Sequence, residues 1–334
     1  MSSKKIITVF GATGQQGGSV AQIFLNDPKL KNDWTVRGVS RNANGESAKK
    51  LISQGAEVVT GDSNDKASLE KAMSGATAVF AVTNYWEKMD GELETQQGKN
   101  MADAAKTTTN RCMHHTTKAA GVKHFIWSSL INVTKASKGR LTKVQHFDSK
   151  ARVEEYIREI GLPATFFMPG IFMSGIAGGT LRRPSSPGAP WTLALPTTDA
   201  VRLPVFTPAD AGKWVKAIVL AGVRELGAGR QVYAATGYMS PQDLLAGFAR
   251  AFPEAGRDAV FATVPDGVFV EGLVRGGAGL PAFAAEDLLQ NMQLMESPGY
   301  YAGASLDESH ALLQDELTTW EEFAKSAPAF KGLK

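Results

Sequence analysis

The feature that most constrains the fold is a short apolar segment followed at once by glycines and then by a helical pattern. Residues 6–10 form a continuous apolar run, long enough for a strand buried on both faces and too short for a helix. Gly11, Gly14 and Gly17 follow in GATGQQG, and an apolar-periodic stretch begins at Val20. Glycines let the backbone approach a pyrophosphate, whose charge the helix N-terminus attracts. The segment predicts a nucleotide site, although glycine turns between strands and helices are common and the spacing differs from GxGxxG.

The end of the next expected strand, residues 34–40, favours a phosphorylated dinucleotide. Arg41 and Asn42 stand where an NAD-selective domain would place an acidic residue for the ribose 2′-hydroxyl. An acid would repel a 2′-phosphate, whereas an arginine would pair with it. The sequence therefore favours NADP over NAD, with Arg37 as a less favoured contact. The alternative is that Arg41 is only a solvated charge at the strand end.

Alternating strand and helix patterns continue to about residue 168. Further strands are expected at 56–60, 76–82, 124–130 and 164–168, with helices at 46–54, 65–73 and 92–105 between them. Short connections of this kind indicate a doubly wound parallel sheet, whose carboxyl edge binds ligands. Thr83, Asn84, Tyr85 and Trp86 follow the fourth strand and are site candidates, though they could equally close a loop.

The pattern changes in the second half of the chain. Residues 182–196 contain four prolines and are expected to form a loop without strand or helix. Helices are expected at 208–220, 240–252, 286–295 and 318–327, with Ser240 as an N-cap and Pro241 in the first helical position. We expect this part to form a smaller lobe that closes a cleft over the carboxyl edge of the sheet.

Composition narrows the class of protein. The 334 residues are 43% apolar and 21% charged, with a net charge of +3 and scattered basic residues, so neither nucleic acid nor an acidic membrane surface is expected as a partner. The single cysteine, Cys112, excludes an internal disulfide and fits a reducing compartment. No signal peptide or 18-residue apolar run is present, so we expect a cytoplasmic protein that also has access to the nucleus.

A polar segment, Thr107 to Lys118, shows neither helical nor strand periodicity. It contains Cys112, His114 and His115, but adjacent histidines lack the spacing of a preorganised metal site, and no metal is expected. A surface insertion is the preferred interpretation.

The amphipathic segment 146–160 carries the candidate catalytic residues. Lys150 shares its apolar stripe with Val153, which is costly unless the ammonium meets a partner or ligand, such as a nicotinamide ribose. The alternative is a lysine whose charged end reaches water. A short-chain reductase usually has tyrosine four residues before such a lysine and serine after the fifth strand. Here the tyrosine position is His146, which can also act as acid or base, and Ser128 and Ser129 end the strand. Reductase chemistry is open but not indicated.

Several stretches together resemble the NmrA-like family, and most closely its HSCARG-like NADP(H) sensor branch. They are GATGQQGGSVA, the VSRN strand end, GAEVVTGD, VTNYWE, HFDSKARVEEYIREIGLPAT and SPQDLLAGFARAF. The resemblance implies an atypical short-chain dehydrogenase/reductase: a Rossmann-type doubly wound parallel sheet in residues 1–175 and a smaller C-terminal α/β lobe in 176–334, interleaved across the cleft. Family members run almost directly from the fourth helix into the fifth strand, so the segment 107–118 is an insertion, expected as a protrusion or disorder.

The resemblance also implies roles for residues that match the family's motifs. The pyrophosphate would lie on Gly11, Ala12, Thr13, Gly14, Gln15, Gln16 and Gly17, and the 2′-phosphate on Arg41 and Asn42. Asp62 and Ser63 would flank the adenine, Thr83, Asn84 and Tyr85 would line the middle of the dinucleotide, Lys150 would meet the nicotinamide ribose, and Phe172 would border the nicotinamide.

Two functions follow from this resemblance and from the residues. One is a non-catalytic NADP(H) sensor that regulates a partner protein or transcription factor, with a homodimer left open. The other is an NADPH-dependent reductase of a small carbonyl or imine substrate, in which Lys150 positions the cofactor and His146 or Ser129 serves the substrate oxygen. A direct DNA-binding role has little support, because no basic stripe appears.

Overall fold

The computed structural model describes residues 4–114, 121–276 and 279–334, without the side chains of 110–114. A seven-stranded sheet with the order β11-β6-β5-β4-β1-β2-β3 forms its larger part, and every neighbouring pair in it is parallel. The doubly wound parallel sheet expected from the sequence is confirmed. Its strands are β1 (Lys5–Phe10), β2 (Trp34–Ser40), β3 (Glu57–Thr60), β4 (Ala78–Ala81), β5 (His124–Ser128), β6 (Ala164–Pro169) and β11 (Arg230–Ala234).

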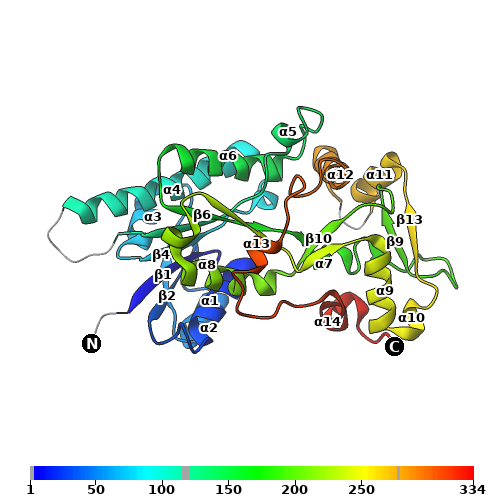
Figure 1. Ribbon diagram of the computed structural model, residues 1–334, viewed down its shortest axis with the longest axis horizontal. Coiled ribbons are helices and arrows are strands. Elements are labelled where there is room, and N and C mark those ends of the chain that lie inside the picture. Colours follow the sequence, from blue (N-terminus) through cyan, green and yellow to red (C-terminus); the bar gives the residue numbers. More distant parts are fainter. Residues whose placement is uncertain (1–3, 115–120, 277–278) are drawn as a thin grey trace.

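Helices cover both faces of this sheet, which agrees with the mostly apolar, buried residues of its central strands β4, β5 and β6. On one face α3, α4 and α6 pack over a core that includes Trp127 and Phe166. On the other face α1, α2 and α8 form a second core with the sheet, to which α1 contributes Phe24 and α8 contributes Trp214 (Figure 1). The helices are α1 (Gln15–Asn26), α2 (Glu46–Ser53), α3 (Lys66–Met73), α4 (Gly91–His114), α6 (Gln145–Glu159) and α8 (Ala211–Leu226).

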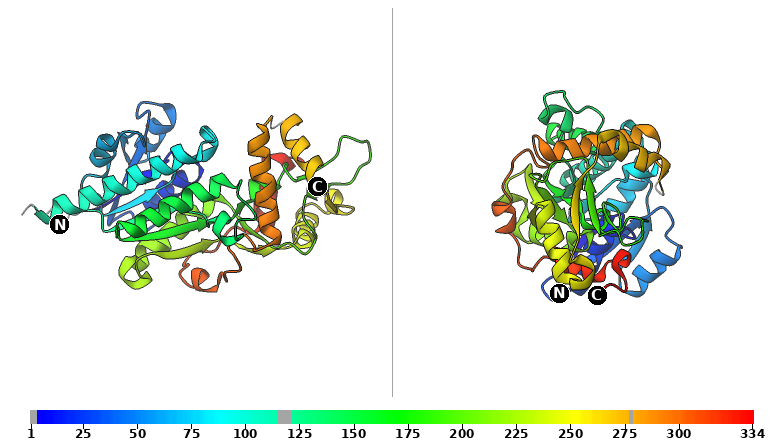
Figure 2. Two further views of the ribbon diagram at one scale, coloured as in Figure 1. Left: turned by 90° about the horizontal axis from the view of Figure 1, so that it is seen from above. Right: turned by 90° about the vertical axis from the view of Figure 1, so that its right-hand side faces the viewer.

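The smaller lobe contains two three-stranded sheets, ordered β12-β10-β7 and β13-β9-β8. Figures 1 and 2 show it at the opposite end of an elongated molecule from the outer helices of the large sheet. Its strands are β7 (Ile171–Phe172), β8 (Leu181–Arg182), β9 (Thr192–Leu195), β10 (Leu203–Phe206), β12 (Gly237–Met239) and β13 (Val260–Thr263). Its main helices are α9 (Pro241–Ala251), α11 (Asp266–Arg275), α12 (Ala282–Glu296) and α14 (Trp320–Ser326). The short helices of both parts of the molecule are η1 (Tyr85–Glu87), α5 (Val133–Ala136), α7 (Met173–Ile176), η2 (Pro208–Asp210), α10 (Pro253–Gly256), α13 (Asp307–His310) and η3 (Pro328–Phe330).

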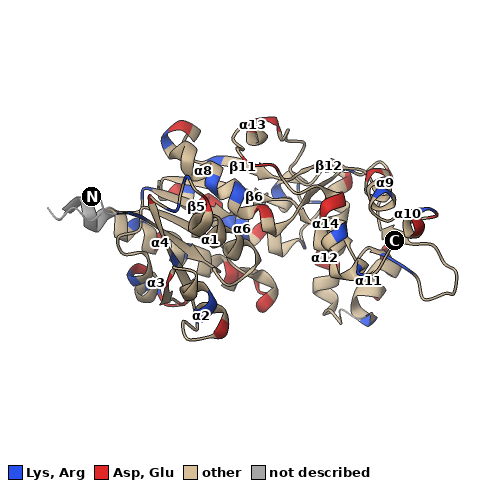
Figure 3. Cartoon of the chain, turned by 90° about the horizontal axis from the view of Figure 1, so that it is seen from below, with Lys and Arg blue, Asp and Glu red and all other residues tan. Residues whose placement is uncertain are grey.

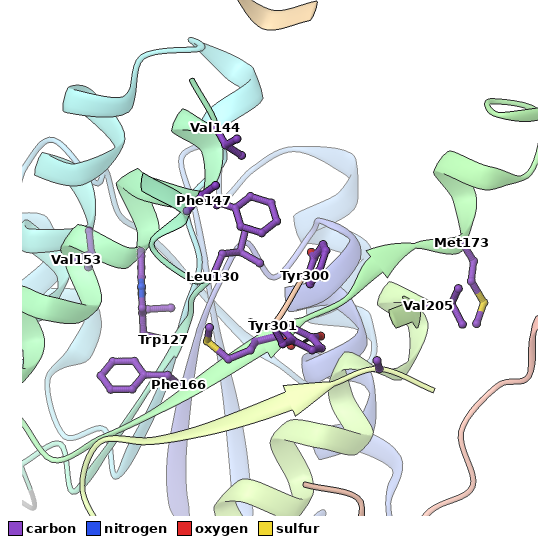
Figure 4. Close-up of a cluster of buried hydrophobic side chains, with 14 of the residues drawn as sticks. Trp127, Leu130, Val144, Phe147, Val153, Phe166, Met173, Val205, Tyr300 and Tyr301 are labelled. Atoms are coloured by element: carbon purple, nitrogen blue, oxygen red, sulfur yellow. Dashed lines mark hydrogen bonds between the residues drawn. The ribbon is translucent and has the colours of Figure 1, made fainter. Parts of the chain in front are cut away.

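The two parts share chain segments. Strand β11 and helix α8 come from the second half of the sequence, yet β11 completes the large sheet beside β6. Two consecutive tyrosines join the parts again, since the hydroxyls of Tyr300 and Tyr301 donate to the carbonyls of Pro169 and Met168 at 3.1 and 2.8 Å. Figure 4 shows these tyrosines in one cluster with Phe147. The division at residue 175 stays a prediction.

Two expectations about local structure are wrong. The stretch 182–196 does contain strand: Thr192–Leu195 is β9, which pairs with β13 and β8, and Arg182 ends β8. The segment Thr107–Lys118 is helical as far as His114, where it extends α4. In α4 the hydroxyls of Thr108 and Thr109 donate to carbonyls one turn earlier, so both hydroxyls have a partner within the helix. Residues 115–118 lie outside the described residues.

Charged residues are distributed over both parts of the molecule. In Figure 3 the positions of basic residues (blue) and acidic residues (red) are interspersed along the helices and loops. Within the described ranges, no helix combines the length and apolar character needed to cross a membrane.

Candidate functional site

The turn between β1 and α1 leaves the N–H groups at the start of the helix without a side-chain cap from the described residues. Gly11 adopts a φ of 62°, which favours glycine, and its carbonyl accepts from the N–H of Gly14 at 2.8 Å. A Cβ at Gly17 would lie 2.3 Å from the Gly11 oxygen, so a side chain does not fit there. No described side chain caps α1, and its first turn carries no acid. This helix end is suited to an anion.

A cleft of about 430 Å³ opens beside this turn, at the carboxyl ends of β1 to β4. It brings together candidates from four separate sequence segments. The predicted cofactor residues that line it are Gly11, Thr13, Arg41, Asn42, Asp62, Ser63, Thr83, Asn84 and Tyr85. The remaining ones are not part of this lining: Ala12 is buried, Gly14 caps α1, Gln15, Gln16 and Gly17 begin it, Lys150 is in α6 and Phe172 is in β7 of the smaller lobe.

Arg41 and Arg37 differ in their availability to a ligand. The Arg37 side chain is 13% exposed and is held by Glu57 at 2.8 Å and by the carbonyl of Ser74 at 2.6 Å. Arg41 is 68% exposed at the cleft and makes one ion pair, with Glu87 at 2.5 Å. The hydrogen bond and charge of Glu87 raise the pKa of Arg41. Of the two arginines, Arg41 can therefore reorient toward a phosphate at less cost.

Local turns position the neighbouring candidates at the cleft. An Asp62 carboxylate oxygen accepts from the N–H of Asn64 at 2.9 Å, which closes a turn after β3. The carbonyl of Ser63 accepts from Asn100 in α4 at 2.9 Å. Likewise, Asn42 accepts from the N–H of Asn44 at 3.1 Å. The strand ends are fixed by their own side chains and by α4.

Lys150 meets a buried carboxylate instead of water. The Lys150 side chain is 12% exposed, and its ammonium pairs with Glu94 and donates to the Thr83 hydroxyl at 3.1 Å. Glu94 is 2% exposed and also accepts from Thr83 at 2.7 Å and from Ser149. Thr83 and Glu94 line the cleft, so Lys150 stands directly behind that wall. Sequence reasoning did not find Glu94, whose only local signal is an acid in the first turn of α4.

His146 is held by a second acid that the sequence analysis missed. Its Nδ1 contacts the carboxylate of Asp287, a residue of α12 that is 1% exposed. Asp287 also accepts from the N–H of Gln145 at 2.9 Å, at the start of α6. The imidazole packs against Trp86, with ring centroids 5.0 Å apart.

Tyr85, at the cleft, stays protonated near neutral pH. Burial, with the negative charges of Asp287 and other nearby acids, raises the pKa of Tyr85 to about 12, so that its phenol is neutral near pH 7.

The serines at the end of β5 point to different partners. Ser129 is fully buried and donates to Glu154 at 2.7 Å, whereas Ser128 donates to Gln16 of the glycine turn at 2.9 Å. Ser128 therefore has the more direct link to the cofactor candidates, and the catalytic role of Ser129 stays a prediction. Phe172 is half-buried with its ring 5.7 Å from that of Phe206.

A metal centre finds no support in the described part of the chain, where no group of three or more His, Cys, Asp or Glu side chains could hold an ion. The side chains of Cys112 and His114, and all of His115, lie outside the described residues.

Comparisons of the sequence and of the structure with known proteins agree on one family. The model of the NmrA-like family matches residues 3–324. The NmrA-like family domain-containing oxidoreductase lnaB of Aspergillus flavus is 34% identical over 167 residues, which are 49% of this chain and 45% of that protein. The chain thus spans about half the length of the curated relatives it matches.

Solved structures show the same fold. NmrA, a negative transcriptional regulator, in complex with NADP, has a TM-score of 0.76 at 21% identity, over 97% of this chain and 95% of that one. The triphenylmethane reductase of Citrobacter sp. complexed with NADP(H) has a TM-score of 0.71 at 21% identity, over 96% and 99% of the two chains. Similarity at this level of identity establishes the architecture alone.

Proposed function

The chain belongs to the NmrA-like family, and from that premise we propose that it binds NADP(H) and that occupancy of the cleft regulates a partner protein. One observation carries the cofactor proposal: the glycine turn and the exposed Arg41 line the same cleft. The backbone N–H groups at the start of α1 would bind the pyrophosphate. The guanidinium of Arg41 would bind the 2′-phosphate.

The engagement of Lys150 favours a sensor over an enzyme. In a short-chain reductase a lysine charge helps to lower the pKa of the catalytic tyrosine. Here the ammonium of Lys150 is paired with Glu94, the tyrosine position is His146, and Ser129 is bonded to Glu154. In such a sensor the cofactor acts by binding one arrangement of the protein more tightly than another. The HSCARG-like branch remains our proposal for the closest functional group.

A reductase of a small carbonyl or imine substrate is the second candidate, and the pair of His146 with Asp287 favours it. A carboxylate on Nδ1 orients an imidazole for proton transfer at Nε2. Bound NADPH would supply the hydride, and this chain would supply the proton from His146. The curated relative from Aspergillus flavus is named an oxidoreductase, which agrees with this alternative.

The proposed partners follow from the sensor function. A regulatory protein, and a second copy of this chain, are the macromolecules that we propose as partners, in preference to nucleic acid. One cysteine in the whole sequence suits a reducing compartment, so we propose the cytoplasm with access to the nucleus.

Calorimetric titration of NADPH, NADP⁺, NADH and NAD⁺ tests the cofactor proposal. We expect wild type to prefer the phosphorylated forms and Arg41→Ala to lose about 1.5–3 kcal/mol of NADPH binding, the value of a hydrogen bond to a charged group, with NADH binding unchanged. Arg275→Ala is the control, because Arg275 is also exposed and paired with a glutamate, but lies on α11 outside the cleft lining. Equal binding of NADPH and NADH by wild type would contradict the proposal.

The absorbance at 340 nm then separates the two functions. The NADPH complex is incubated with a panel of carbonyl and imine compounds. A constant absorbance is the result expected for a sensor, and substrate-dependent loss of absorbance that disappears in His146→Ala would establish the reductase instead.

A further inference from the structure

The lining of the cleft is rich in acids for a surface that would bind phosphates. Its basic residues are Arg41 and Lys88, whereas its acidic residues are Asp62, Glu87, Asp90 and Glu94. Three of these acids have other partners: Asp62 and Asp90 accept from backbone N–H groups of their own turns, and Glu94 pairs with Lys150. Glu87 is the one that contacts Arg41.

The contact between Arg41 and Glu87 joins two separate elements across the cleft. Arg41 follows β2, and Glu87 is the last residue of η1, which follows β4. Both side chains line the cleft, with Nη1 and Oε1 2.5 Å apart. The carboxylate therefore occupies one of the N–H donors of the Arg41 guanidinium, for which a bound 2′-phosphate would compete.

We infer that Glu87 sets the cofactor selectivity of the cleft by competing with the 2′-phosphate for Arg41. This inference rests on the proposed binding of NADP(H). The carboxylate lowers the affinity for dinucleotides that carry the 2′-phosphate and leaves the affinity for those that lack it unchanged. Selectivity for NADP(H) over NAD(H) is thus lower than Arg41 alone would give.

The exposure of the pair sets the size of the effect. Arg41 is 68% and Glu87 36% exposed, and exposed ion pairs contribute little because water screens them. A phosphate, with its greater charge and several acceptor oxygens, can replace such a partner. Loss of the competing carboxylate is expected to strengthen binding of phosphorylated ligands by about two- to five-fold, the range of exposed pairs.

The test compares wild type, Glu87→Gln and Glu271→Gln, each as the 334-residue chain. Glu271 is the matched control, because it pairs with Arg275 at the same 2.5 Å and is also exposed, but lies outside the cleft lining. Each protein is titrated calorimetrically with NADPH, NADH, 2′,5′-ADP and 5′-AMP. We expect Glu87→Gln to bind NADPH and 2′,5′-ADP about two- to five-fold more tightly and the other two ligands as wild type does. Glu271→Gln should match wild type throughout.

Other outcomes overturn the inference in distinguishable ways. If wild type prefers NADPH and Arg41→Ala loses that preference, but Glu87→Gln gains nothing or gains equally for NADH, then Glu87 does not compete and the proposed function stands. If wild type binds none of the four ligands, the inference fails together with the proposed function. A melting temperature within the error of wild type confirms that Glu87→Gln is folded.

Discussion

At the scale of single residues, His124 makes stability depend on pH. It begins β5, is 6% exposed, and one ring nitrogen lies 2.8 Å from the Thr165 hydroxyl. Burial lowers its pKa from 6.5 to about 4. The unfolded chain therefore binds a proton at a higher pH than the folded protein does. The contribution of neutral His124 to the unfolding free energy is fully present above pH 6.5, falls as the pH drops toward 4, and is lost below pH 4.

Urea unfolding of wild type and His124→Gln between pH 8 and pH 4 tests this dependence. At pH 8 the histidine is neutral in both states, so the difference in unfolding free energy there reports only the lost packing. From pH 6.5 to 4 wild type should lose up to about 3 kcal/mol that the variant retains, since each unit of pKa shift corresponds to about 1.4 kcal/mol. If the unfolding free energies of wild type and His124→Gln fall in parallel as the pH is lowered, His124 does not cause the pH dependence.

At the scale of elements, two adjacent glycines after the turn between β1 and α1 differ in the room they leave for a side chain. A Cβ at Gly17 would meet the Gly11 and Phe10 carbonyls at 2.3 and 2.5 Å, whereas one at Gly18 would lie 3.5 Å from its nearest neighbour, the Ala12 oxygen. Gly17→Ala should therefore open the turn, reduce stability by about 1–3 kcal/mol and weaken NADPH binding. Gly18→Ala is the matched control and should gain about 0.4–1 kcal/mol with NADPH binding retained. Thermal unfolding and calorimetry measure both effects, and equal losses in the two variants would contradict this account.

The same elements show what the sequence could predict. The β1–α1 turn could be predicted because a buried strand, a glycine turn and a helix start each leave a local sequence pattern. Strand β9 was not, because prolines flank its four residues and its partner β13 lies far along the chain. The helical continuation through Thr108 and Thr109 was missed because β-branched polar residues lower helix propensity, and only the folded chain shows their hydroxyls satisfied within the helix.

Some residues of the candidate site could likewise be predicted from the sequence, and others could not. Arg41 and Lys150 were found by position relative to a strand end and an apolar stripe. The acidic partners of Lys150 and His146 were not predicted: Glu94 lies 56 residues from Lys150, and Asp287 lies 141 residues from His146. Pairings across such distances depend on tertiary packing, which no local spacing encodes.

At the scale of the whole molecule, Asp287 connects the two parts at the start of α6. From α12 it accepts from the backbone N–H groups of Gln145 and His146, at 2.9 and 3.3 Å, and contacts the His146 ring. One buried carboxylate thus accepts from two N–H groups at the helix start and fixes the His146 ring beside Trp86. We expect this residue to determine how firmly the smaller lobe stays on the large sheet.

Three variants rank the contributions of this contact. Asp287→Asn removes the charge from both the backbone and the ring and should destabilise the protein by about 1.5–3 kcal/mol in urea unfolding. His146→Gln leaves Asp287 on the backbone N–H groups and should cost less. Glu286→Gln, on the exposed side of the same helix, should stay within about 0.5 kcal/mol of wild type. If the lobe is held through Asp287, limited proteolysis near α12 should accelerate in the same order. A larger loss in His146→Gln than in Asp287→Asn would place the connection in the ring packing instead of the carboxylate.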